Sequence, residues 1–182
     1  MPTRWVNGMI AAGATTAAIT PQLKAMLDQM SNDCYTAISS TLGISKEKLM
    51  SDADLLVFYD LRGDASLLTV GEVTGLSSSF QSLANYAAAS TPPGYSPAAM
   101  VVTVRQGSSI VITNDVLILP AFWNYTQYIG DPNPFQVMVH ELLHFSSRLN
   151  DIDLATRLTG NSFTSIAAAS QALTNWLANC FQ

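Results

Sequence analysis

Histidine and basic residues are scarce in this chain of 182 residues. It contains only two histidines and eight Lys and Arg residues, against thirteen Asp and Glu residues, which gives a net charge of −5. Nucleic-acid-binding and peripheral membrane proteins need clusters of positive charge, which this composition does not supply. The chain also lacks an apolar run of about 20 residues, the length that spans a bilayer. We therefore expect neither a nucleic acid nor a membrane among its partners.

Cysteine is also rare, and the two residues, Cys34 and Cys180, lie far apart in the sequence. They can form one disulfide that ties an N-terminal helix to the C-terminal helix, which requires an oxidising compartment. The alternative, which the sequence favours equally, is a pair of buried free thiols. The many Ser, Thr, Ala and Asn residues and the few Lys residues favour an extracellular protein, so we expect secretion.

The composition otherwise describes one compact domain. Hydrophobic residues make up 48% of the chain and charged residues 12%. A chain of this length can bury a large core without help from a metal or a disulfide. We expect a single domain over residues 1–182, and a monomer.

A short motif stands out in an apolar run: His140-Glu141-Leu142-Leu143-His144. Residues four apart on a helix lie on the same face, so the two imidazoles can bind one Zn²⁺ ion. Glu141 follows the first histidine and is placed to accept a proton from a zinc-bound water molecule as general base. The alternative is a metal-free core helix, which would have to bury all three polar side chains with hydrogen bonds.

Hydrophobic periodicity and turn residues predict an α+β fold around this motif. The polar segments 45–54 and from Asn150 onwards are expected to be connections. Helices are expected at 20–43, 79–89, 134–149 and 165–181, and strands at 55–59, 67–70, 100–104, 109–113 and 116–119.

The third zinc ligand can be narrowed by elimination, because a catalytic zinc usually takes three protein ligands. No other histidine exists, and no glutamate follows Glu141. Cys180 belongs to an apolar helical stripe. The remaining carboxylates after the motif are Asp151 and Asp153, so the third ligand should be an aspartate.

The segment His140-Glu141-Leu142-Leu143-His144-Phe145, followed by Asp153 nine residues after the second histidine, resembles the aspzincin metallopeptidases, the group of deuterolysin and peptidyl-Lys metalloendopeptidase. The resemblance implies a zinc endopeptidase acting on protein or peptide substrates. It also implies His140, His144 and Asp153 as zinc ligands, Glu141 as the base, and a zincin-like fold with a small twisted mixed sheet packed on helices. Asp151 remains the alternative third ligand.

The chain departs from the family pattern after the motif. The family has a tyrosine three residues after the aspartate, where this chain has Thr156, and glycines before it, where this chain has Asn150 and Asp151. The tyrosine is expected to stabilise the oxyanion of the reaction. A catalytically impaired zincin-fold domain that binds a partner, or forms the effector part of a larger secreted protein, is therefore the alternative function. Substitute donors would be Arg148, Arg157, Tyr125 or Tyr128.

A peptide substrate of such an enzyme would lie extended along a sheet edge. We expect this edge at 109–113 or 116–119. Phe122, Trp123 and Tyr125 would line a side-chain pocket, or else pack as ordinary core and loop residues.

Overall fold

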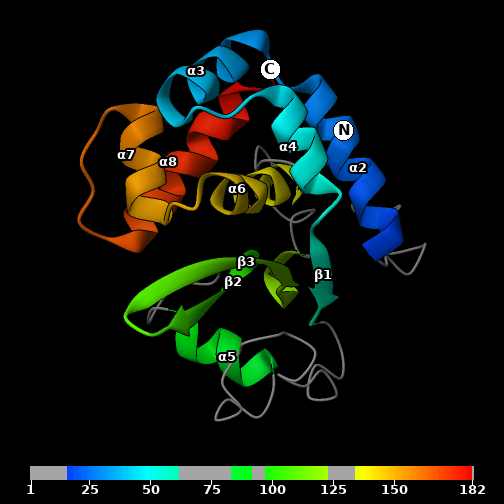
Figure 1. Cartoon of the computed structure of the whole chain (residues 1–182), viewed down its shortest axis with the longest axis vertical. Helices are drawn as coiled ribbons and strands as arrows, with labels where there is room; N and C mark the ends of the chain where they lie inside the picture. The colour runs from blue at the N-terminus through cyan, green and yellow to red at the C-terminus, as the bar shows by residue number, and fades with distance from the viewer. Residues whose placement is uncertain (1–15, 62–82, 92–96, 123–133, 182) are drawn as a thin grey trace.

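A computed structural model describes residues 16–61, 83–91, 97–122 and 134–181. This part of the chain contains seven helices and a mixed three-stranded sheet, which confirms the α+β class (Figure 1). In chain order the elements are α2 (Thr16–Gln29), α3 (Asn32–Leu42), α4 (Lys46–Ala53), β1 (Val57–Asp60), α5 (Leu83–Ser90), β2 (Ala99–Gln106), β3 (Ser109–Ile118), α6 (Pro134–Ser147), α7 (Asp151–Thr159) and α8 (Ile166–Asn179).

The N-terminal region is two helices, so the single helix expected at 20–43 was wrong. Ser31 interrupts it with an extended backbone, and its hydroxyl oxygen accepts a hydrogen bond from the backbone N–H of Cys34. A serine in this conformation is a typical N-cap, which starts α3 as a new helix. The predicted end at Gly43 is correct, because this glycine takes the left-handed conformation (φ 69°) that commonly terminates helices.

Segment 45–54, expected to be a connection, contains helix α4. Ser45 caps it by accepting the backbone N–H of Lys48. Near its end, the buried carboxylate of Asp52 accepts hydrogen bonds from the Ser146 hydroxyl and the Lys48 ammonium group, both at 2.7 Å. Because Ser146 belongs to α6, its bond to Asp52 holds α4 against the helix that carries the histidine motif.

The sheet has the strand order β1-β3-β2, with β1 parallel and β2 antiparallel to β3. The strands expected at 109–113 and 116–119 are one strand, β3, with an irregularity opposite Val102. Asn114 and Asp115, which lie between the two expected strands, are part of β3: Asn114 donates to the carbonyl oxygen of Leu55, just before β1, and Asp115 accepts from the hydroxyl of Tyr59 in β1. The strand expected at 67–70 lies outside the described residues.

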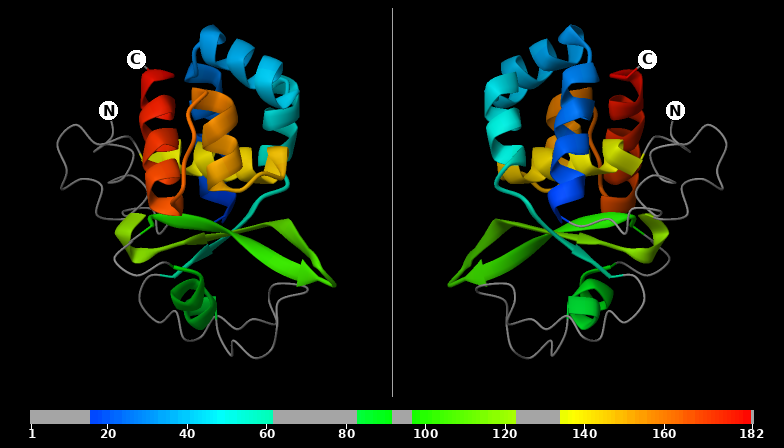
Figure 2. Two further views of the ribbon diagram at one scale, coloured as in Figure 1. Left: turned by 90° about the vertical axis from the view of Figure 1, so that its left-hand side faces the viewer. Right: turned by 90° about the vertical axis from the view of Figure 1, so that its right-hand side faces the viewer.

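Helix α6 lies on one side of the sheet, surrounded by α2, α4, α7 and α8, whereas α5 lies on the opposite side (Figures 1 and 2). Four side chains of α6 are completely buried: Met138, Val139, Leu142 and Leu143. The apolar residues of the motif therefore form part of the main core, which holds the histidine-bearing helix in place. Among the described residues, no helix is long and apolar enough to cross a membrane.

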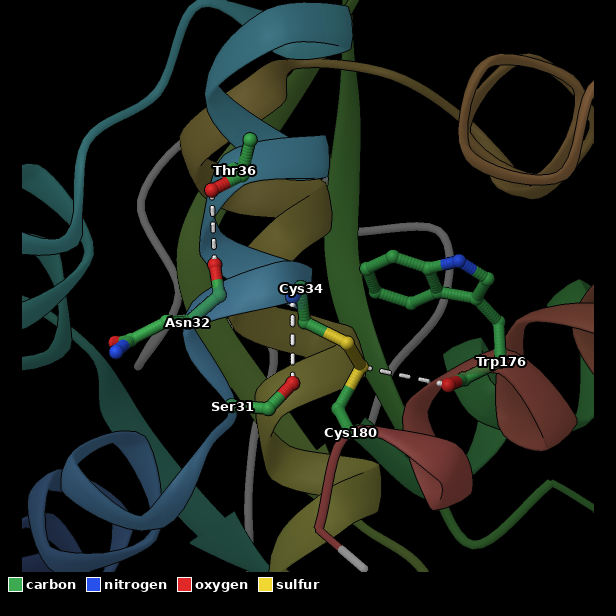
Figure 3. The surroundings of a disulfide bond; sticks show 6 residues. All are labelled: Ser31, Asn32, Cys34, Thr36, Trp176 and Cys180. Atoms are coloured by element: carbon green, nitrogen blue, oxygen red, sulfur yellow. Dashed lines mark hydrogen bonds between the residues drawn. A yellow bond between two sulfur atoms is a disulfide. The ribbon is translucent and has the colours of Figure 1, made fainter.

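Cys34 and Cys180 form a disulfide with an S–S distance of 2.05 Å, which excludes the free-thiol alternative (Figure 3). The bond joins α3 to the end of α8 across 146 residues of sequence. Next to it, the backbone N–H of Ser31 donates to the carbonyl oxygen of Cys180 at 2.9 Å. Such a bond persists in oxidising compartments, so it is compatible with an extracellular protein.

Candidate metal centre

Helix α6 begins at Pro134 and ends at Ser147, close to the predicted range of 134–149. It ends where Arg148 takes a left-handed backbone conformation (φ 62°) and its N–H donates to the His144 carbonyl oxygen. His140 and His144 are buried one turn apart, with ring centroids 4.8 Å from each other. The expected pairing of the two imidazoles on one face is therefore confirmed.

Asp151 completes a cluster with these histidines. Its Oδ1 atom lies 2.9 Å from His140 Nε2 and 3.0 Å from His144 Nε2, and the two Nε2 atoms are 2.9 Å apart. Asp151 is the first residue of α7, whose N-cap is Asn150. Two histidines and an aspartate thus present one potential ligand atom each to a common point.

Asp153, the ligand that we expected from its spacing, lies outside this cluster. The expectation assumed a loop after Asn150, but the backbone is already helical from Asp151. Because successive helical residues rotate by about 100°, Asp153 points about 200° away from Asp151 around the helix axis. Its side chain is exposed, although it borders the same cleft. The structure therefore places the alternative aspartate, Asp151, with the histidines.

The hydrogen bonds of His144 define which of its nitrogens carries the proton. Its Nδ1 lies 2.7 Å from the carbonyl oxygen of Leu149, which can only accept, so Nδ1 donates. In the neutral ring, Nε2 then has a lone pair. That lone pair faces the carboxylate of Asp151, which also carries lone pairs, so the contact needs either a proton on Nε2 or a metal ion between the two groups.

The electrostatics of the cluster also favour a bound cation. Burial alone lowers the pKa of His144, but its hydrogen bond to the Asp151 carboxylate and the charges of Glu141 and Asp151 outweigh burial and raise the pKa to about 9. Burial alone raises the pKa of Asp151, but the two histidines outweigh it and hold the pKa of this carboxyl well below its usual range. The site therefore attracts either a proton or a metal ion.

The donor set fits zinc. Two imidazole nitrogens and one carboxylate oxygen are ligands that zinc prefers, and three protein ligands leave one position open. Tetrahedral coordination at about 2.0 Å places ligand atoms about 3.3 Å apart, a few tenths of an ångström more than the spacing in the cluster. A small outward movement of the side chains would accommodate the ion.

Glu141 lies next to the cluster and is buried. Its Oε2 atom accepts a 2.8 Å hydrogen bond from the backbone N–H of Val101 in β2. Burial raises the pKa of Glu141 and Asp151 adds to this, whereas the two histidines and the Val101 bond lower it. The carboxylate is therefore fixed in position and has an increased affinity for a proton.

A cleft of about 350 Å³ opens beside these residues. Its lining includes all four polar residues of the site and parts of β2, β3, α5, α7 and α8. Two exposed isoleucines border it: Ile110 on β3, with 67% of its surface exposed, and Ile166 at the start of α8, with 46% exposed. The cleft is thus large enough for part of a peptide and is partly apolar.

Among the described strands, β2 is an outer strand of the sheet and borders the cleft at Ala99, Val101 and Thr103. Of the two edges expected to bind substrate, both on β3, residues 116–118 pair with β1 on one side and β2 on the other, whereas residues 109–112 pair with β2 alone among the described strands. On β2, the backbone N–H groups of Val101 and Thr103 point away from β3, towards Glu141 and the Tyr86 hydroxyl respectively. The edge expected at 116–119 was therefore wrong, whereas the edge expected at 109–113 stays a prediction.

Of the substitute donors expected for the oxyanion, Arg148 borders the cleft. Its Nη1 atom donates to the Ile112 carbonyl oxygen at 2.6 Å, and its guanidinium carbon lies 4.4 Å from the centre of the Phe145 ring. Arg157 is exposed on α7 and is not part of the cleft lining. Tyr125, Tyr128 and Trp123 lie outside the described residues.

Two aromatic residues, Phe122 and Tyr86, decide how the expectations for this part of the site turn out. Phe122 is completely buried in the main core, which is the packing alternative. Tyr86 was not expected at the site, but it borders the cleft and its hydroxyl bonds Thr103. No motif in the sequence marks Tyr86, because its position depends on how α5 packs against the sheet.

Comparisons of this chain with protein families, curated proteins and solved structures find no match. The functional interpretation therefore depends on the geometry and chemistry of the site.

Proposed function

We propose that this protein is a zinc-dependent endopeptidase in which His140, His144 and Asp151 hold the metal and Glu141 is the general base. The observation that carries the proposal is the convergence of two imidazole nitrogens and one carboxylate oxygen within 3.0 Å of one another. A buried glutamate adjoins them, and a cleft gives access. A secreted protein with a zincin-like fold is part of the same proposal, and the disulfide and the helix packed on a mixed sheet support it.

Zinc, when bound at such a site, polarises a substrate carbonyl and lowers the pKa of a water molecule. The protein supplies a group that moves the proton. The Val101 N–H orients the Glu141 carboxylate, and burial raises the pKa of this group. A carboxylate with a raised pKa accepts a proton more readily and then returns it to the leaving amine. Glu141 therefore combines a fixed orientation with a raised pKa, the two properties that this role needs.

The substrate is proposed to lie along the outer edge of β2, where backbone groups can pair with an extended peptide. Residues Ala99, Val101 and Thr103 of this edge border the cleft. Tyr86 bonds the N–H of Thr103 and so restricts pairing beyond Val101. The Val101 N–H already donates to Glu141, so the part of this edge proposed to pair with a substrate is the one towards Ala99.

The proposal is tested by measuring zinc content and cleavage on the same protein, purified with its disulfide intact and without added metal. We expect one zinc per chain and cleavage of unfolded casein. Glu141→Gln should retain zinc and lose cleavage by about 100-fold or more, because general-base catalysis contributes about 10²- to 10⁴-fold.

Two results would contradict the proposal in different ways. Absence of bound metal in the wild-type protein, even after incubation with zinc, would exclude the metal centre. Stoichiometric zinc without cleavage, even at high protein concentration, would instead support the alternative of a catalytically impaired zinc-binding domain.

A further inference from the structure

The two histidines of the cluster differ in the hydrogen bonding of Nδ1, the ring nitrogen that does not face the cluster. His144 Nδ1 donates to the Leu149 carbonyl oxygen at 2.7 Å. In the described part of the chain, His140 Nδ1 has no such partner, although its Nε2 faces the cluster in the same way. A histidine that binds a metal through Nε2 carries a proton on Nδ1, and this N–H almost always has an acceptor.

A buried acceptor without a partner lies one turn away. Gln136 precedes His140 by four residues on α6, and its Oε1 atom is inaccessible to solvent and accepts no hydrogen bond. Side chains on a helix incline towards its N-terminus, so the His140 ring lies over the turn that contains Gln136. An unpaired buried polar atom of this kind costs about 1–3 kcal/mol, which favours any arrangement that pairs it.

Gln136 and His140 also border the same small cavity, together with Val137, Thr174 and Leu177. This cavity has no space for a water molecule. A bridging water therefore cannot satisfy the amide oxygen there, and a protein donor is required. The His140 Nδ1–H group is the donor that zinc binding would provide beside it.

We propose that Gln136 is a positioning residue of the zinc site, whose Oε1 accepts the Nδ1–H of His140 and so fixes the orientation of that ring. This inference rests on the proposed zinc centre but not on peptidase activity. Outer partners of this kind typically change metal affinity by about 10- to 100-fold when they are removed.

Thr174 is the competing partner, because it borders the same cavity. Its hydroxyl donates to the Ser170 carbonyl oxygen at 3.0 Å, which leaves its lone pairs available as acceptors. Thr174→Val removes the hydroxyl and preserves the shape of the side chain. Comparing this variant with a Gln136 variant therefore identifies which residue His140 uses.

The test is competition for zinc against a chromophoric chelator. Gln136→Met removes the acceptor at similar volume and should weaken zinc binding by about 10- to 100-fold. Gln136→Glu keeps an acceptor and should retain wild-type affinity, as should Thr174→Val. Gln22→Met is the matched control, because Gln22 on α2 also has a buried and unpaired Oε1 atom.

Thermal unfolding of the metal-free variants separates positioning from folding, since Gln136→Met and Gln22→Met should unfold alike without zinc. Wild-type zinc affinity in Gln136→Met, or equal weakening in Gln22→Met, would overturn the inference. Weakened binding in Thr174→Val alone would assign the role to Thr174 instead. A wild-type protein that binds no zinc would overturn both proposals, whereas zinc binding without cleavage would overturn only the peptidase proposal.

Discussion

Glu141 on α6 accepts a 2.8 Å hydrogen bond from the backbone N–H of Val101 on β2, forty residues earlier in the chain. This N–H bonds Glu141 and not β3, and β2 is an outer strand among the strands that the structure describes. One bond therefore connects the proposed general base with the strand edge along which we place the substrate. It positions the carboxylate and also lowers its pKa.

Val101→Pro should shift the activity profile to higher pH. Proline removes the N–H that stabilises the charged carboxylate, so the pKa of Glu141 rises further. A general base must be deprotonated to act, so activity increases as the pH rises through its pKa. A higher pKa therefore moves this rising, acid limb of the pH–activity profile to higher pH. The measurement is kcat/KM for a peptide substrate as a function of pH, with zinc saturating.

Val101→Ala is the control for that experiment, because it changes the side chain and keeps the N–H. Proline is tolerated at a strand edge where the N–H does not pair with a neighbouring strand. An acid limb that stays in place in a folded Val101→Pro variant, or that moves equally in Val101→Ala, would contradict the role of the bond.

Asp151→Ala and Asp153→Ala should differ in zinc binding. Asp151→Ala removes a direct ligand. It should weaken zinc affinity by more than about 100-fold, the largest effect typical of residues that only support a ligand. Asp153 is exposed and faces away from the histidines, so its removal should leave the affinity unchanged. Zinc titration of both metal-free proteins gives the comparison. Weaker binding in Asp153→Ala than in Asp151→Ala would restore the ligand set implied by the family resemblance.

The sequence predicted the part of this site that depends on local geometry. The spacing of His140 and His144 on an apolar helix was sufficient to place both imidazoles together, because helical periodicity alone brings residues four apart to one face. The helix end near Ser147 and the restriction of the third ligand to an aspartate also followed from the sequence. Elimination left both Asp151 and Asp153 open, because α7 was taken for a loop, and the family resemblance implied Asp153; the structure groups Asp151 with the histidines.

Signals for α7 were present in the sequence. Asn150 is a favourable N-cap, two aspartates stand in the first turn, and Gly160 ends the helix with a φ of 75°. The positions of Tyr86 and Val101 at the site carry no comparable local signal. They depend on contacts between segments far apart in the chain, which periodicity and capping do not encode.

Replacing both cysteines with serine should destabilise the fold. The disulfide closes a segment of 146 residues, so its removal greatly increases the entropy of the unfolded chain. Removing a native disulfide from a small secreted domain typically costs about 2–5 kcal/mol. Urea unfolding of the Cys34→Ser, Cys180→Ser double variant gives the difference, and wild-type protein reduced with dithiothreitol should match it. Equal unfolding free energies with and without the bond would contradict this structural role.

Ile110 and Ile166 should favour substrates with apolar side chains. Both border the cleft and remain exposed, which leaves apolar surface available for a substrate to bury. Ile110→Ser and Ile166→Ser should each lower kcat/KM for a peptide with leucine beside the scissile bond by about 10-fold, since contacts of a single methylene in a pocket contribute about 1–3 kcal/mol. A glycine-substituted peptide should be cleaved at an unchanged rate.

Leu55→Ser is the matched control, because Leu55 is 54% exposed and lies outside the cleft lining. Equal losses for the leucine and glycine peptides would indicate general damage to the cleft, and an effect of Leu55→Ser as large as the others would exclude a specific role for the two isoleucines.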